Sequence, residues 1–108
     1  MAHERVVVIH PDHPSLPGHF PGHPVVPGVV LLGEVMESLH QLSEQPMAVT
    51  GLPIVKFASP LKPGEALTIH MEEDGPNSVT FRCHVGTRLV ASGSLQLTRL
   101  PLGETGAL

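Results

Sequence analysis

The chain has 108 residues, of which 41% are hydrophobic and 15% are charged, and its formal net charge at pH 7 is −4. This length predicts one domain, and so small a domain gains from burying a hydrophobic face against a second subunit, so we expect an oligomer. The six Lys and Arg residues form no basic run that could follow a phosphate backbone, which argues against nucleic-acid binding.

A short β-branched run at residues 5–9 predicts the first strand. The stretch that follows, residues 10–27, carries six prolines. Proline fixes φ and removes a backbone donor, so this stretch is expected to be a stiff loop without regular structure. A stiff loop suits a site that must hold its shape.

Residues 29–42 predict a helix of about four turns, with Pro27 suited to its first turn and Pro46 just past its end. The start of this helix is apolar on all sides, which is typical of a helix covered by other structure. Its apolar run is far shorter than the roughly 20 residues that span a bilayer, and no signal-peptide pattern precedes it. We therefore expect a cytoplasmic protein that is neither inserted in a membrane nor secreted.

The second half of the chain alternates apolar and polar residues, which predicts an antiparallel meander that curls round the helix, an α+β fold. Cys83, the single cysteine, alternates with apolar residues and is expected to be a buried, inert thiol. We expect residues 1–100 to form the domain and residues 101–108 to be a frayed tail. The predicted strands are residues 47–60, 65–72, 78–85 and 89–100.

Two segments resemble the signature of the 3-hydroxyacyl-acyl-carrier-protein dehydratases. They are Gly18-His19-Phe20-Pro21-Gly22-His23-Pro24-Val25-Val26-Pro27-Gly28-Val29 and Val55-Lys56-Phe57-Ala58-Ser59-Pro60-Leu61-Lys62-Pro63-Gly64-Glu65. The resemblance implies the hotdog fold, in which an antiparallel sheet wraps one central helix. It also implies loss of water from a 3-hydroxyacyl thioester on acyl carrier protein, giving a trans-2-enoyl thioester in fatty acid or polyene biosynthesis, without a cofactor.

The resemblance assigns roles within the first segment. His19 stands at the position of the base that removes a proton from C2, a task that suits a neutral imidazole. The N–H of Gly28, an unpaired donor at the helix start, matches the group that polarises the thioester carbonyl. Core packing explains the apolar residues of the helix start equally well. The expected substrate contacts are Phe20, Pro21, Gly22, Val29, Leu32 and Gly33.

The helix departs from the family pattern at one position, because Gly33 stands where the family has its catalytic Asp or Glu. Glu34 is adjacent but turned about 100° round the helix, whereas Glu37 lies one turn further on, on the face of Gly33. We favour Glu37, acting through a water, as the acid, with Glu34 as the second candidate. The alternative is that both glutamates are solvated or paired, and that Gly33 reflects close packing or a lost function.

Histidines are the other chemically versatile residues. His13, His19 and His23, with Asp12, could suggest a zinc site, but the prolines between them restrict convergence, and no metal is expected. His70 and His84 alternate with apolar neighbours and are expected to point outward from strands.

Three functions remain open. The first is a dehydratase that works as a homodimer, or as an oligomer of dimers, with each site formed between two subunits. The second is an acyl-binding or partner-dependent subunit, in which a heterodimer supplies the missing carboxylate. The third is a hotdog thioesterase, which the intact dehydratase loop argues against.

Overall fold

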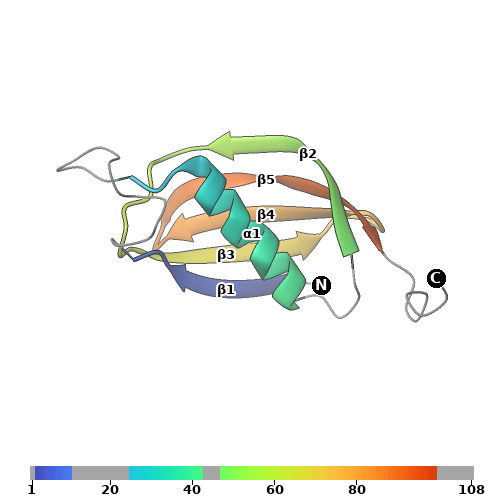
Figure 1. Ribbon diagram of the computed structural model, residues 1–108, viewed down its shortest axis with the longest axis horizontal. Helices are drawn as coiled ribbons and strands as arrows, with labels where there is room; N and C mark the ends of the chain where they lie inside the picture. The colour runs from blue at the N-terminus through green and yellow to red at the C-terminus, as the bar shows by residue number, and fades with distance from the viewer. Residues whose placement is uncertain (1, 11–24, 43–46, 100–108) are drawn as a thin grey trace.

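The structure, a computed structural model, describes residues 2–10, 25–42 and 47–99. One helix lies across one face of a single sheet (Figure 1), so the prediction of an α+β fold is confirmed. The expected frayed tail, residues 101–108, lies outside the described residues. In chain order the elements are β1 (Ala2–Val8), α1 (Gly28–Leu42), β2 (Met47–Phe57), β3 (Ala66–Glu73), β4 (Ser78–Val85) and β5 (Arg88–Arg99).

The five strands pair in the antiparallel order β1-β3-β4-β5-β2. The meander is confirmed for β3, β4 and β5, but the prediction that it starts with β2 is wrong. β1 pairs with β3 along its whole length, from Ala2 opposite Glu72 to Val8 opposite Ala66. Since β4 pairs with the other side of β3, no edge of β3 remains for β2. β2 therefore pairs with β5 at the far edge, and residues 58–65 cross the end of the sheet to reach β3 (Figure 1).

β2 bends where its pairing with β5 is irregular. The register shifts between Val49 and Gly51 and again between Gly51 and Ile54, and such bulges bend a strand and increase its twist. Gly93 of β5 lies beneath this bend. A Cβ atom there would overlap the carbonyl oxygen of Ile54 and the ring of Phe81, so only glycine permits the close approach of the two strands.

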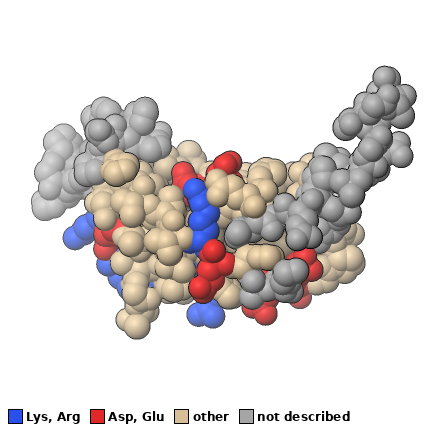
Figure 2. Space-filling model, turned by 90° about the horizontal axis from the view of Figure 1, so that it is seen from below, with Lys and Arg blue, Asp and Glu red and all other residues tan. Residues whose placement is uncertain are grey.

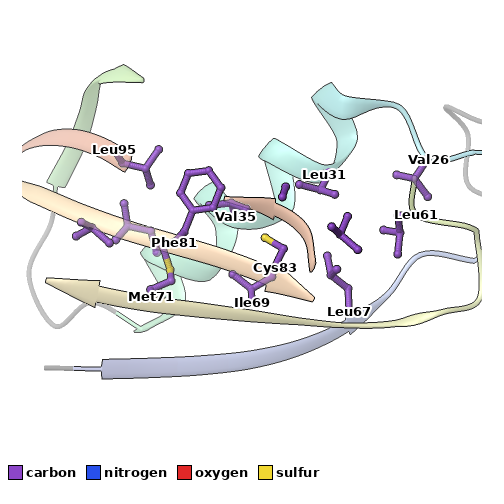
Figure 3. Close-up of a cluster of buried hydrophobic side chains, with 14 of the residues drawn as sticks. Val26, Leu31, Val35, Leu61, Leu67, Ile69, Met71, Phe81, Cys83 and Leu95 are labelled. Atoms are coloured by element: carbon purple, nitrogen blue, oxygen red, sulfur yellow. The ribbon is translucent and has the colours of Figure 1, made fainter. Parts of the chain in front are cut away.

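The core lies between α1 and the sheet (Figure 3). Leu31, Val35 and Leu39 recur along one stripe of the helix and are buried, as expected for the packed face of an amphipathic helix. Cys83 of β4 is fully buried, and this burial raises the pKa of its thiol to about 12. The prediction of a buried, inert thiol is confirmed.

The helix start is less covered than its composition predicts. Val29 is 78% exposed, so the expectation that other structure wraps the helix start on all sides is wrong for this subunit. The reason is geometric, because the sheet covers one stripe of the helix and Val29 lies outside it. Within the described residues, no helix is both long enough and apolar enough to cross a bilayer.

Candidate functional site

The start of α1 and the ends of β1 and β2 meet at one end of the molecule, on the left in Figure 1. The segment that connects β1 to α1 leaves and returns there. Its predicted site residues, His19, Phe20, Pro21 and Gly22, lie outside the described residues. The structure describes the residues on either side of it, residues 9–10 after β1 and residues 25–27 before α1.

A pocket of about 460 Å³ opens at the start of α1. Its volume lies in the range of sites that hold small molecules, and most of its lining is apolar, as in such sites. Gly28, a predicted site residue, is part of the wall. The lining residues are Val25, Val26, Gly28, Leu31, Phe57, Ala58, Ser59, Pro60, Leu61 and Val90.

The first turn of α1, which begins at the pocket wall with Gly28, leaves backbone donors without a backbone partner among the described residues. The carbonyl of Pro27 accepts from the N–H groups of Val30, at 3.0 Å, and Leu31, at 3.2 Å. Within the described part of the chain, the N–H groups of Gly28 and Val29 donate to no backbone acceptor. They are unpaired donors at the positive end of the helix dipole, a place that favours a developing negative charge.

A glycine at position 28 makes room for an aromatic ring. A Cβ atom on Gly28 would lie 3.0 Å from Cζ of Phe57, so a larger residue would displace the ring. Phe57 ends β2 and is itself 55% exposed. The ring and the helix start together form one wall of the pocket.

Glu34 is turned toward β1. Its Oε1 lies 3.3 Å from Nη1 of Arg5, which also donates to Oγ of Ser38 at 2.9 Å. Ser38 is fully buried and donates to the carbonyl of Glu34 at 2.8 Å. Figure 2, seen from the side of β1, shows acidic and basic side chains next to one another in small mixed groups. Glu34 is thus engaged in holding α1 on β1.

Gly33 and Glu37 lie on an exposed face of α1. No described residue of this subunit lies within 4 Å of a Cβ atom placed on Gly33, so packing within the described part of the chain does not explain the glycine. Oε1 of Glu37 accepts from Nε2 of Gln41 at 3.1 Å. The structure therefore separates the two candidate acids, with Glu37 on the exposed side and Glu34 at the sheet. Leu32 is half-buried between these two sides.

The two strand histidines, His70 and His84, lie away from the pocket. His70 lies on the solvent face of the sheet, with Nδ1 3.2 Å from a carboxylate oxygen of Glu4, and His84 contacts the carbonyl of Gly86, so both point outward as predicted. Across residues 2–10, 25–42 and 47–99, no group of three or more His, Cys, Asp and Glu side chains is placed to hold a metal. His13, His23 and Asp12 lie outside that part of the chain.

The contribution of residues 58–61 and Val90 to the pocket wall was not among the predictions. The signal was present, because residues 55–65 resemble the dehydratase family as clearly as the histidine segment does. What was missing was the path of the chain. The prediction extended the strand to residue 60 and joined it to the next strand by a tight turn. In the structure β2 ends at Phe57, and residues 58–65 cross beneath the start of α1.

Comparisons with known proteins agree with this architecture. A family model described as ApeI-like, ApeI dehydratase, matches residues 2–94. The 3-hydroxyacyl-[acyl-carrier-protein] dehydratase FabZ of Dechloromonas aromatica is 32% identical over 105 residues, covering 84% of this chain and 73% of the relative. FabZ of Chlamydia trachomatis serovar L2 is 31% identical over 99 residues, covering 78% of this chain and 63% of the relative. The chain thus spans less than two thirds of the length of some curated relatives.

Solved structures are similar over nearly the whole chain. A chain of the dehydratase heterocomplex ApeI:P from Xenorhabdus doucetiae superposes with a TM-score of 0.80 and 27% identity, covering 91% of this chain and 88% of that one. A protein from Erwinia carotovora subsp. atroseptica gives a TM-score of 0.78 and 30% identity, covering 92% and 84%. The fluoroacetyl-CoA thioesterase FlK, at 16% identity and a TM-score of 0.69, shares the fold alone. The fold is the hotdog fold.

Proposed function

The chain belongs to the ApeI-like family of dehydratases, and we propose that it removes water from a 3-hydroxyacyl thioester to give a trans-2-enoyl thioester. The substrate is carried by acyl carrier protein, in the cytoplasm, in fatty acid or polyene biosynthesis. One observation carries the proposal: the apolar pocket includes Gly28, whose N–H is unpaired within the described residues, at the place where the His19 segment meets α1.

The proposed reaction needs a base, an oxyanion donor and an acid. His19 takes the proton from C2, and negative charge develops on the thioester oxygen. The N–H of Gly28 stabilises this charge, a role for which a fixed helix-terminal donor is well suited. The bond between C3 and its hydroxyl then breaks, and the departing oxygen takes a proton from the acid and leaves as water. Exchange with solvent returns the His19 proton to the acid for the next turnover.

The acid is proposed to be Glu37, acting through a water, or a carboxylate from a second subunit. Glu37 lies on the exposed face that also carries Gly33, and its carboxylate accepts a hydrogen bond from Gln41 on the same helix. Glu34 is a weaker candidate, because its carboxylate already accepts from Arg5 beside β1. Among the described residues, none lies within 4 Å of a Cβ atom at position 33, which leaves room in this part of the structure for a group from another chain.

We propose that a second hotdog subunit, a copy of this chain or a relative, covers the β2 edge. β2 is an edge strand, and it carries exposed apolar residues: Ile54 is 53% exposed, and Leu52 and Phe57 are also exposed. Val29, beside the pocket wall, is the most exposed of the large apolar residues. Apolar surface of this kind marks an interface. The heterocomplex ApeI:P supports a heterodimer as one form, and a homodimer or an oligomer of dimers is the other.

A second candidate function is a subunit that binds acyl chains or supports a catalytic partner without dehydrating alone. Gly33, in place of the acid that the family resemblance implies, supports it. A thioesterase is a third candidate, on the shared fold alone.

The test is a mass-spectrometric dehydration assay of the purified chain with a panel of 3-hydroxyacyl carrier proteins. We expect turnover that His19→Ala abolishes while the mass of the oligomer is unchanged. The matched control is His70→Ala, which removes a histidine on the solvent face of the sheet and should leave turnover unchanged. Turnover that survives His19→Ala contradicts the assignment of the base. Absence of turnover with every chain length favours the partner-dependent subunit.

A further inference from the structure

Residues 58–65 cross the end of the sheet from β2 to β3, and the carboxylate of Glu65 helps to hold the part of this crossing segment nearest β3. Oε1 of Glu65 accepts from Nη2 of Arg88 at 2.8 Å and from the N–H of Lys62, also at 2.8 Å. The same Nη2 of Arg88 donates to the carbonyl of Pro60 at 3.3 Å. The Glu65 and Arg88 pair therefore fixes the crossing segment at two backbone positions.

The crossing segment also binds both ends of the connection between β1 and α1. The N–H of Gly64 donates to the carbonyl of Ile9, just after β1, at 2.8 Å. The N–H of Val26, just before α1, donates to the carbonyl of Leu61 at 2.8 Å. The segment that contains His19 begins at one of these bonds and ends at the other. On the crossing segment, the carbonyl of Leu61 and the N–H of Gly64 make these two bonds, and both residues lie within four positions of Glu65.

We propose that Glu65 and Arg88 are positioning residues, which fix both ends of the His19 segment relative to the pocket. This inference rests on the proposed function for its catalytic consequence, but the anchoring itself does not depend on it. Arg88 suits the role because it begins β5, next to the hairpin that joins β4 and β5, and so it ties the crossing segment to a paired part of the sheet. A rigid support of this kind is what places a catalytic group accurately.

The chemistry of the pair agrees with this role. Hydrogen bonds between a guanidinium and a carboxylate are stronger than neutral ones. The hydrogen bond from Arg88, and then that from the N–H of Lys62, hold the pKa of Glu65 below its usual value of 4.5. Glu65 is therefore ionised at neutral pH. The Glu65 side chain is 24% exposed and that of Arg88 is 44% exposed, so solvent screens the pair in part.

The other half of the crossing segment is anchored separately. The N–H groups of Ala58 and Ser59 donate to the carbonyl of Val90, and Oγ of Ser59 donates to the carbonyl of Leu89 at 2.7 Å. Loss of the Glu65 and Arg88 pair should therefore loosen the part nearest Gly64 and leave the part nearest β2 in place. The expected effect is local, which makes it separable from unfolding.

Hydrogen exchange on the full-length chain tests the anchoring without a substrate. In Glu65→Gln and Arg88→Met, we expect the amides of Val26 and Gly64 to exchange about tenfold faster or more, with amides of β3 and β4 unchanged. Arg88→Lys keeps a charged donor and should restore part of the protection. The matched control is Glu72→Gln, a carboxylate beside His70 on the solvent face, which should change neither amide.

The dehydration assay tests the consequence. In Glu65→Gln we expect kcat to fall about tenfold with a smaller change in KM, because the base is misplaced while the pocket walls remain. Unchanged exchange at Val26 and Gly64 overturns the proposal, whatever the activity. Faster exchange with an unchanged kcat overturns the positioning role. If the wild-type chain shows no dehydration, the proposed function fails, and the exchange ratios still decide whether the pair anchors the segment.

Discussion

The two sides of α1 differ sharply. On the sheet side, Val35 and Ser38 are fully buried, and Arg5 reaches across from β1 to bind Ser38 and Glu34. On the other side, Val29 and Gly33 are exposed, and so is Glu37 one turn further on. The sheet side holds the subunit together, whereas the exposed side carries Glu37, the favoured candidate acid, and the glycine at position 33. One stripe of the helix thus supplies stability, and the opposite stripe carries the positions at which an acid is proposed.

Two valines provide the largest test of this difference. Val35→Ala should lower the free energy of unfolding by about 2 kcal/mol, because it removes buried methyl groups and leaves a cavity. Val29→Ala should change it by less than about 0.5 kcal/mol, since this side chain is exposed in the subunit. Urea unfolding at a fixed, low protein concentration measures both.

A large effect of Val29→Ala would contradict the description of that side as exposed in the isolated subunit. If the effect also grew with protein concentration, it would show that a second copy covers Val29 in solution, because stability gained by association depends on concentration. The valine pair therefore tests both the packed side and the proposed interface.

Sequence patterns predicted the helix and the strands but not which strands pair in the sheet. Alternation identified the four strands after the helix, because it reports which face of a strand is buried. A β-branched run identified the first strand, and the flanking prolines bounded the helix. None of these patterns could report that β2 pairs with β5, because pairing depends on which edge remains free once β1 has paired with β3.

The candidate site was predictable to a similar extent. The glycine at position 28 and the missing carboxylate at position 33 were visible in the sequence. The partner of Glu34 was not, because Arg5 lies 29 positions away and only the packing of α1 on β1 brings the two together. The bonds from Val26 and Gly64 are likewise backbone contacts across the fold, which no side-chain pattern records.

The Arg5 cluster gives a second, smaller test of the sheet side. Arg5→Met should lower the free energy of unfolding by about 1 kcal/mol, because it leaves Glu34 without its cation and Ser38 without one donor, although partial exposure reduces the cost. Glu37→Gln, on the exposed side, is the control and should leave stability within about 0.5 kcal/mol of wild type. An equal loss of unfolding free energy in Arg5→Met and Glu37→Gln would contradict the claim that the sheet side of α1, and not its exposed side, stabilises the subunit.

Gly33→Asp tests the exposed side with the smallest expected change in stability. A Cβ atom at position 33 meets no described neighbour within 4 Å, and glycine and aspartate differ by only a few tenths of a kcal/mol in helix propensity. Unfolding should therefore be nearly unchanged. If the site lacks only a carboxylate at this position, the dehydration rate should rise about tenfold or more, the scale of general acid catalysis.

Gly33→Asn separates the acid from the shape of the side chain, because asparagine fills the same space but cannot donate a carboxyl proton. A gain with Asp and none with Asn would show that a carboxylate at position 33 acts as the acid. No gain with Asp, at unchanged stability, would show that the helix accepts the side chain and that the proton comes from elsewhere. Glu37→Gln then distinguishes the remaining sources, since it should abolish turnover if Glu37 is the acid and spare it if a second subunit supplies the proton.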